Sequence, residues 1–391
     1  MKKLTRKRKN SLLIFLFSAI FLVAALSPLT PGAEIQTRMM LNSLGIDVTA
    51  EGVVVTAETI NGGDNEIVSG KGSMLSEALQ DMNERYGRNI ELGHCGLVAL
   101  GNTLGRSDIV SVLMSILSDA KVNAGCSVVG TDSSAHEFMS DAVLLTKSTG
   151  EGITGFVTFA DSQASVTIPS VLELMQSLKS KSGAAALPVI GLRDKPEEKG
   201  TGEASSQSSE GGGGGGSQND QSQKETEIVP PKVARIIGSE VYELDEDVTR
   251  GLVWMTPRST GGMMETEFEL SGKIYTIRAI LKDKDAGIAA EFDDKPVITL
   301  KVDATLKFTD RYAMLAEVEA GKTMSEVFNG MNEAFMRTIT EEVKAIAEAS
   351  RKDDFLGYRT ALYRVSPRKF KEWSGNPDDI ELKFDVKASV L

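Results

Sequence analysis

Two stretches near the C-terminus show the clearest alternation of apolar and polar positions in the chain. Between residues 298 and 308 every second residue is apolar, and the residues between them are charged or threonine. Residues 380–390 repeat this pattern. A period of two predicts β-strands with one face in a core and one face in water. Residues 268–270 and 273–277, separated by Ser271-Gly272, predict a hairpin that precedes them.

The segment between these strands has a helical period instead. Thr323 and Glu326 have the spacing of a capping box, which predicts a helix from Thr323 to about Ser350, roughly 40 Å long at 1.5 Å per residue. This helix should lie across the buried face of the sheet, so that Phe335→Ala should cost about 3 kcal/mol or more. The sequence therefore predicts a C-terminal α+β domain, residues 261–391, in which one long helix covers an antiparallel sheet. Its apolar stripe is Val327, Met331, Ala334, Phe335, Ile339, Val343 and Ile346.

Strand and helix patterns alternate over residues 34–145. This order is typical of an α/β or mixed α+β domain, and it predicts an α+β fold class for the chain, with mixed sheets and packed helices in several domains. The expected elements are strands at 53–59, 93–100 and 128–129, a helix capped by Ser73 and ending at Gly87, a helix opening at Ser107 and Asp108, and a helix opened by the capping-box pair Ser134 and Glu137.

The middle of the chain is less regular, and we expect a middle domain over residues 146–194 and 228–260. Residues 150–155 match GxGxxG, but a dinucleotide site needs that loop to open a helix, and residues 156–159 are typical of a strand. We interpret the motif as a flexible turn. Pro169 and Ser170 with Glu173 predict a helix that ends at Gly183. Residues 195–227 are rich in Gly, Ser, Gln and Glu and predict a disordered linker.

The N-terminus combines six cations with an uninterrupted apolar run at residues 11–28. We expect residues 1–33 to be a cytoplasmic basic head followed by a membrane anchor or an export signal, with the body of the protein outside the cytoplasm. The run is about long enough to cross roughly 30 Å of hydrocarbon. An uncleaved single span, cleaved secretion and a buried helix all stay open, and mass spectrometry of the mature N-terminus distinguishes them.

Charge and composition narrow the functional classes. The chain of 391 residues has a net charge of −12 and is 41 % hydrophobic, which argues for a folded, acidic body. Nucleic-acid binding needs clustered cations, so this body is a poor candidate for it. Acidic pairs such as Asp293-Asp294 and Asp353-Asp354 are interpreted as parts of a solvated face.

The sequence contains few patterns typical of catalysis or metal binding. His94, Cys95, Cys126 and His136 are the only His and Cys residues, and their spacing matches no common zinc pattern. The two cysteines either form a bridge or stay buried as small apolar residues. Residues 316–323 narrowly miss the phosphate-loop pattern, and no GxSxG occurs. We therefore predict no catalytic, cofactor-binding or metal residues and no enzyme; binding residues stay unknown.

Several short landmarks resemble one protein family. Residues 44–47 (Leu-Gly-Ile-Asp), 70–73 (Gly-Lys-Gly-Ser) leading to 77–79 (Glu-Ala-Leu), and Gly93-His94 occur in the order found in the C subunits of spore germinant receptors, the Ger(x)C family. Residues 234–254 resemble its central element, an aliphatic strand, an acidic turn and an Arg-Gly-Leu segment ending in Trp. The tail from Asp354 to Trp373 resembles its C-terminal pattern.

The resemblance covers residues 34–140 and 233–391, most of the exported chain. It implies a membrane-attached, non-enzymatic subunit that works beside an integral membrane subunit and a soluble-headed partner in nutrient sensing, at the spore inner membrane. The family's lipid-attached cysteine is missing here, so the run at 11–28 would replace it. The alternative is an exported small-ligand-binding or structural protein. Neither the germinant nor its contact residues follow from the sequence.

Overall fold

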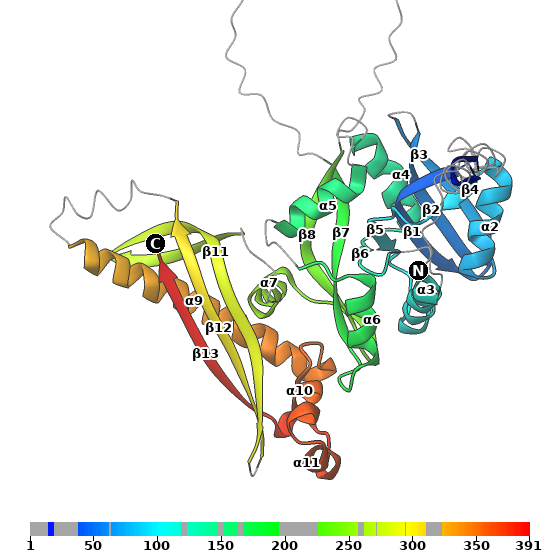
Figure 1. The fold of residues 1–391 in the computed structure, drawn as a ribbon. Helices are drawn as coiled ribbons and strands as arrows, with labels where there is room; N and C mark the ends of the chain where they lie inside the picture. Colours follow the sequence, from blue (N-terminus) through cyan, green and yellow to red (C-terminus); the bar gives the residue numbers. More distant parts are fainter. Residues whose placement is uncertain are drawn as a thin grey trace, which may run out of the picture.

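The structure is a computed structural model that describes residues 15–18, 38–61, 64–118, 123–146, 152–162, 167–194, 226–256, 262–270, 272–293, 295–309 and 323–391. The expected basic head, nearly all of the apolar run and the linker from 195 to 225 lie outside these residues. The described part contains two sheets joined through a short helix, α7 (Figure 1).

The first sheet has nine strands and contains the N-terminal half of the described chain. Its order is β3-β2-β1-β5-β6-β7-β8-β9, with β4 beside β1. Strands β1, β5, β6 and β7 run parallel, and the hairpin strands at both edges are antiparallel. The bounds are β1 Arg38–Thr49, β2 Gly52–Asn61, β3 Asp64–Gly72, β4 Asn89–Glu91, β5 Leu97–Leu100, β6 Ser127–Thr131, β7 Ala185–Asp194, β8 Thr226–Ile237 and β9 Val241–Glu243.

Helices cover both faces of this sheet, because alternate residues of a strand point to opposite faces. On β5, Val98 and Leu100 pack in one core, whereas Leu97 and Ala99 pack in another. The first core also contains α2 (Leu75–Tyr86), α3 (Arg106–Ser118) and α6 (Val171–Lys179); the second contains α4 (Ala135–Thr146) and α5 (Gly152–Ser162). A strand buried on both faces is apolar without interruption, which is why β5 shows no alternation.

The nine strands come from both the expected N-terminal domain and the expected middle domain. Strand β7 pairs with β6 at Gly130 and Thr131, so the boundary expected near residue 145 runs through a hydrogen-bonded sheet. Residues 226–227, expected in the linker, belong to β8, where Glu227 pairs with Arg193 of β7. The division of the chain into domains stays a proposal.

The second sheet confirms the predicted C-terminal architecture, with one difference. Strands β10 (Met263–Leu270), β11 (Lys273–Phe292) and β12 (Pro296–Phe308) are antiparallel. The long helix α9 (Met324–Asp353) packs its predicted stripe on them, except for Ile346, which packs with Ile236 of β8 and Leu252 of α7 instead. Strand β13 (Glu381–Val390), however, is parallel to β12. The expectation of an antiparallel sheet is therefore wrong for this strand. Helix α9 lies between β12 and β13 in the chain and carries it back to the end of the sheet at which β12 begins, and a parallel pair needs such a crossover connection. The smaller elements are α7 Glu246–Met255, α10 Tyr358–Val365, α11 Pro367–Glu372 and η3 Pro377–Asp379.

Capping-box predictions are confirmed for two helices. Thr323 with Glu326 opens α9, and Ser170 with Glu173 opens α6, which ends at Lys179 rather than near Gly183. Helix α2 begins one residue later than expected, with Met74 at its N-cap, while Ser73 donates to the Glu77 carboxylate. It ends at Gly87, whose φ of 61° suits glycine.

One segment has the wrong predicted element. Residues 156–159 were expected to form a strand after a turn at the GxGxxG motif, but they lie in helix α5. Ile153 and Val157, four residues apart, are both buried in the second core, so burial of one helix face outweighs the β-propensity of the segment.

Candidate functional site

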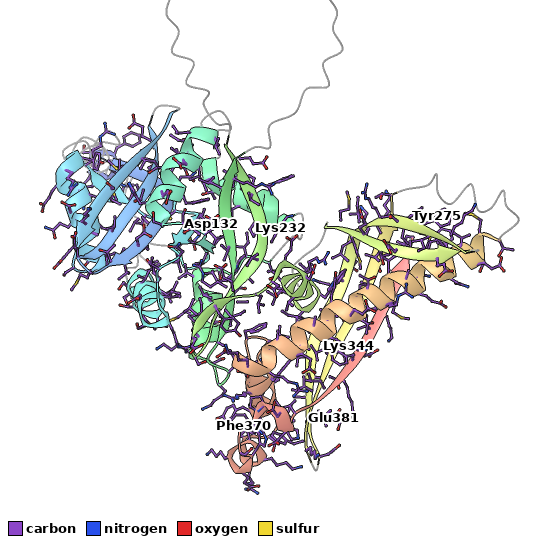
Figure 2. All side chains as sticks on the ribbon, turned by 180° about the vertical axis from the view of Figure 1, so that it is seen from behind. Asp132, Lys232, Tyr275, Lys344, Phe370 and Glu381 are labelled. Atoms are coloured by element: carbon purple, nitrogen blue, oxygen red, sulfur yellow. The ribbon has the colours of Figure 1, made fainter. Side chains whose placement is uncertain are left out.

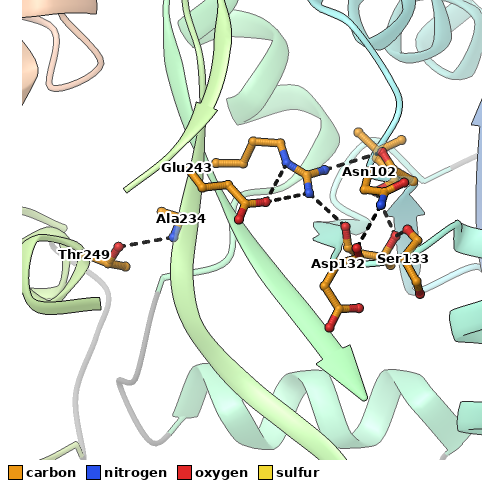
Figure 3. A network of polar contacts seen from close by, with 10 residues as sticks. Asn102, Asp132, Ser133, Ala234, Glu243 and Thr249 are labelled. Carbon is orange, nitrogen blue, oxygen red and sulfur yellow. Dashed lines mark hydrogen bonds and ion pairs between the residues drawn. The ribbon is translucent and has the colours of Figure 1, made fainter. Parts of the chain in front are cut away.

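The carboxyl ends of the parallel strands carry a buried polar network centred on Arg235 of β8 (Figure 3). The Arg235 side chain is 4 % exposed; Nη2 donates to Thr131 O at 2.9 Å and to Glu243 Oε1 at 2.8 Å. Nη1 donates to Gly101 O at 3.4 Å. A guanidinium stays charged, so its burial requires this set of acceptors. The network joins β5, β6, β8 and β9, and it leaves little of the cation for a ligand.

A second acidic group at this edge is also used internally. The Asp47 carboxylate, at the end of β1, accepts from Ala135 N at 2.8 Å and His136 N at 2.9 Å, the first residues of α4. A carboxylate at a helix N-terminus satisfies free N–H groups and complements the helix dipole. The family landmark at residues 44–47 therefore ends on a helix cap. Its glycine, Gly45, is needed because a Cβ would lie 2.8 Å from Met139 Cγ.

A glycine of the GxGxxG motif, Gly152, lies against the buried carboxylate of Glu58. This carboxylate accepts from Ser43 Oγ at 2.6 Å, from Asn65 Nδ2 at 2.9 Å and from the backbone of Ile153. Burial raises the pKa of Glu58, although these donors oppose the shift. A Cβ on Gly152 would lie 2.3 Å from Glu58 Oε1, so the glycine lets α5 begin directly over the carboxylate.

The cysteines and histidines do not form a site. Cys95 and Cys126 are both free and buried; Cys95 Sγ donates to Leu97 O at 3.2 Å and Cys126 Sγ donates to Ser127 O at 3.7 Å. Contact with Cys95 and burial raise the pKa of the Cys126 thiol, which keeps it protonated. His136 Nδ1 lies 2.9 Å from Thr56 Oγ1. Within the described ranges, no group of three or more His, Cys, Asp or Glu residues could hold a metal ion.

The acidic pair at Asp353 and Asp354 is buried, so the expectation of a solvated face is wrong. Asp354 accepts from Tyr358 N at 2.6 Å and Arg359 N at 2.8 Å, which caps helix α10. Asp353 Oδ1 accepts from both Ser239 N and Ser239 Oγ at 2.7 Å. The N-cap preference for aspartate does not signal the first role, because Asp354 is the C-cap of α9 and Gly357 is the N-cap of α10. The second depends on a partner 114 residues away.

Asp353 belongs to a joint between the two sheets. Beside it, Ser182 Oγ and Thr360 Oγ1 are 2.9 Å apart. Gly251 of α7 lies against α9 so closely that a Cβ there would be 2.4 Å from Glu342 O and 2.6 Å from Ile346 Cβ. The joint explains why the Arg-Gly-Leu segment has glycine at its centre: the two helices touch through backbone.

The joint also contains a pocket of about 280 Å³, which is the candidate binding site. Its floor includes Trp254, which is 4 % exposed and donates through Nε1 to Glu342 Oε2 at 2.5 Å. Arg250 Nε lies 3.6 Å from Glu342 Oε1. Burial raises the pKa of Glu342, although the indole donor and Arg250 oppose the shift. The apolar wall is formed by Val253, Met263, Met264 and Leu281.

A buried lysine lies next to this wall. Lys284 of β11 donates through Nζ to Val253 O, and burial lowers the pKa of Lys284 to about 8. The pocket thus combines an aromatic and aliphatic wall with two accessible cations, Lys232 and Arg250, and carboxylates of Glu246, Glu265 and Glu342. Lys232 Nζ lies 3.3 Å from Glu246 Oε1, which leaves Arg250 as the cation nearest Glu342. These groups can bind a small molecule that carries both charges, and the sequence could not assemble them because they come from β8, α7, α9, β10 and β11.

Two sequence predictions concern regions that the structure covers only in part. The near phosphate loop at residues 316–323 lies outside the described residues except for Thr323, which is the N-cap of α9. For the predicted anchor at 11–28, only residues 15–18 are described. Among the described residues, no helix has the length and apolar character needed to span a bilayer.

Two family models match the chain, one after the other. The model described as "Spore germination protein N-terminal domain" matches residues 32–192, and "Spore germination B3/ GerAC like, C-terminal" matches residues 236–391. A solved structure titled "Crystal Structure of the GerBC protein" is similar at 14 % identity with a TM-score of 0.49, covering 89 % of this chain and 97 % of that chain. No curated protein matched the chain.

Proposed function

The chain belongs to the Ger(x)C family of spore germination proteins, and from this membership we propose that it is a membrane-attached, non-catalytic subunit of a nutrient receptor that acts by contact with integral membrane subunits. Its role in spore germination follows from the family. The anchor at residues 11–28, the position outside the cytoplasm and the partners belong to the proposal.

The joint is the observation that supports this proposal best. Both family regions lie in one chain and are connected by the Ser239–Asp353 and Ser182–Thr360 contacts and by the close packing of Gly251 on α9. Close-packed interfaces resist continuous deformation, so surfaces on the two sheets keep a defined relation to each other. A protein of this kind can hold partners in register without chemistry of its own. Asp47 and Asp354 are used to bind helix N-termini, and Arg235 joins neighbouring strands, so these buried groups stabilise the surfaces on which such a role depends.

Membrane fractionation and co-purification test the proposal. The tagged full chain is expressed in a spore-forming host, and spore membranes are solubilised in mild detergent. We expect the intact chain in the inner-membrane fraction together with a polytopic membrane protein. The matched control replaces residues 11–28 with a cleavable export signal, which should move the chain to the soluble fraction. Recovery of the intact wild-type chain from the cytosol would contradict the proposal.

The pocket at the joint favours a second function, the binding of a small zwitterionic ligand. Arg250 can pair with a carboxylate, Glu342 or Glu246 with an ammonium group, and Trp254 with an apolar side group. A ligand at 100 times its Kd stabilises the folded state by about 2.7 kcal/mol, which a thermal melt of the full chain detects.

A panel of free amino acids is the natural probe for this second function. We expect Arg250→Ala to abolish the stabilisation. Arg193→Ala is the matched control, because this exposed arginine pairs with Glu227 and does not line the pocket. If none of the amino acids raises the melting temperature of the wild type, the pocket does not have this function.

A further inference from the structure

Strand β13 is an edge strand with one set of backbone groups facing outward. It is last in the order β10-β11-β12-β13, and in the described part of the chain only β12 pairs with it. Leu391 N donates to Leu306 O at 2.8 Å and Leu391 O accepts from Phe308 N at 3.4 Å, so residue 391 points its backbone at β12. Backbone groups alternate along a strand. The amides of Leu382, Phe384, Val386 and Ala388 therefore point away from the sheet.

The contact of Val390 agrees with this alternation of inward and outward amides. Val390 N, on the outward side, donates to Asn332 Oδ1 of α9 at 2.7 Å. Helix α9 thus covers the edge at its C-terminal end. The stretch from Leu382 to Ala388 is left for a further strand.

The side chains of the same residues line a groove beside α9. Leu382, Phe384, Val386 and Ala388 are only partly buried, although they face the core beneath α9. Phe384 and Val386 form one wall of a groove of about 320 Å³, and Met336, Thr340 and Lys344 of α9 form the other. Met336 is 40 % exposed, and Lys344 Nζ lies 5.9 Å from the ring centroid of Phe384. Figure 2 shows Lys344 on α9 above the strand that begins at Glu381.

The opposite face of β13 carries charges of alternating sign. Glu381, Lys383, Asp385 and Lys387 are exposed, and among the described residues their ion pairs lie along their own strand, at 3.5 Å for Lys383–Glu381 and 3.9 Å for Lys387–Asp385. Charged side chains on an edge strand often prevent association, and they do so best when all of them have the same sign. Charges that alternate in sign instead permit pairing with a second strand whose charges alternate in the complementary order.

We propose that β13 pairs antiparallel with β13 of a second copy of this chain, with Phe384 on the two-fold axis. In this register each residue is opposite the partner residue for which the two numbers sum to 768. Glu381 then meets Lys387 of the second copy and Lys383 meets Asp385, twice each around the axis. The outward amides of Leu382, Phe384 and Val386 meet one another, as an antiparallel ladder requires.

Neighbouring registers with the same backbone parity bring like charges together. A shift that places Leu382 opposite Phe384 puts Lys383 opposite itself, and a shift the other way puts Asp385 opposite itself. Like charges directly opposite each other destabilise a strand pair. The two-fold axis is normal to the sheet, so both copies of α9 lie on one face of an eight-stranded sheet, and the two grooves adjoin. The interface is self-complementary, as a two-fold dimer demands.

Charge reversal followed by mixing tests the pairing. In Lys383→Glu the dimer would place Glu opposite Asp385 twice, and in Asp385→Lys it would place Lys opposite Lys383 twice. Each variant should dissociate at least about tenfold more readily than the wild type. A mixture of the two restores opposite charges at every position and should restore the dimer. The full chain is measured by sedimentation in density-matched detergent. All four side chains are exposed, so folding is retained.

Cysteine cross-linking tests the register itself. Residues 381 and 387 would be opposite each other, at the Cα separation of about 4.5 Å that suits a disulfide. Glu381→Cys should therefore cross-link with Lys387→Cys in a mixture, and neither should cross-link with itself, because like positions lie roughly 20 Å apart along the strands. The native cysteines are buried, and the wild-type chain serves as control.

Four results would overturn the proposal. These are a monomeric wild type, a dimer insensitive to both reversals, a mixture that stays monomeric, and self-cross-linking of Glu381→Cys. A dimer formed through the apolar run at residues 11–28 would give the second result. A different protein whose strand occupies β13 while the chain stays monomeric would give the first. None of these results bears on membrane attachment or on the receptor partners.

Discussion

The substitution Phe335→Ala measures how much of the C-terminal fold depends on α9. Phe335 is 0 % exposed and lies in the core between α9 and the second sheet. A buried aromatic side chain removes about 150–250 Å² from water, worth about 4–6 kcal/mol at 25 cal/mol per Å². A compact unfolded state lowers this by roughly 10–40 %, and alanine retains a small part. We expect a loss of about 3–4 kcal/mol in the free energy of unfolding.

Urea unfolding followed by tryptophan fluorescence is the suitable assay. The chain has two tryptophans, and both Trp254 and Trp373 contact the core that contains Phe335, so the signal reports the unit under test. Met336→Ala is the matched control, because the neighbouring side chain is 40 % exposed; it should change stability by less than about 1 kcal/mol. A loss below about 1 kcal/mol for Phe335→Ala, or equal losses for both variants, would refute the packing of α9 on the sheet.

Three other predictions follow from the joint and from buried groups. Gly251→Ala should lower the melting temperature, since overpacking of about 1–3 kcal/mol outweighs a helix-propensity gain of about 1 kcal/mol; Gly287→Ala, which meets open space, is the control, and a rise in stability would sink the close-approach argument. Lys284 has a folded pKa of about 8 against 10.5, so the unfolded state binds more protons between these values and stability should rise with pH from about 8 to 10.5. Lys284→Met should flatten that rise in pH-dependent unfolding, and an unchanged slope would count against burial of the ammonium group. Cys95 and Cys126 should resist alkylation in the native protein and react after unfolding, whereas non-reducing peptide mapping that finds them bridged would contradict the free thiols.

Local patterns predicted the elements whose stability comes from one repeated face. The alternation in β12 and β13 and the stripe of α9 each place apolar side chains on one side, and the structure buries that side in β12 and α9 and partly buries it in β13. The capping boxes at Thr323 and Ser170 succeeded for the same reason, because donor and acceptor are three residues apart. The prediction of a strand at residues 156–159 was wrong because a distant residue stabilises a helix there. The β-branched residues of α5 favour a strand, but the carboxylate of Glu58, about a hundred residues earlier, accepts a hydrogen bond from the backbone of Ile153 in the first turn.

The sequence alone determined the α+β class, the long C-terminal helix, the family resemblance and the lack of a recognisable catalytic motif, since each rests on residues close together in the chain. Tertiary structure alone decided that β13 runs parallel to β12, that Asp353 binds Ser239 and that Arg250, Trp254 and Glu342 share a pocket. These contacts join segments up to a hundred or more residues apart. Their free energy comes from burial and from pairing buried polar groups, and neither is encoded in the period of any one segment.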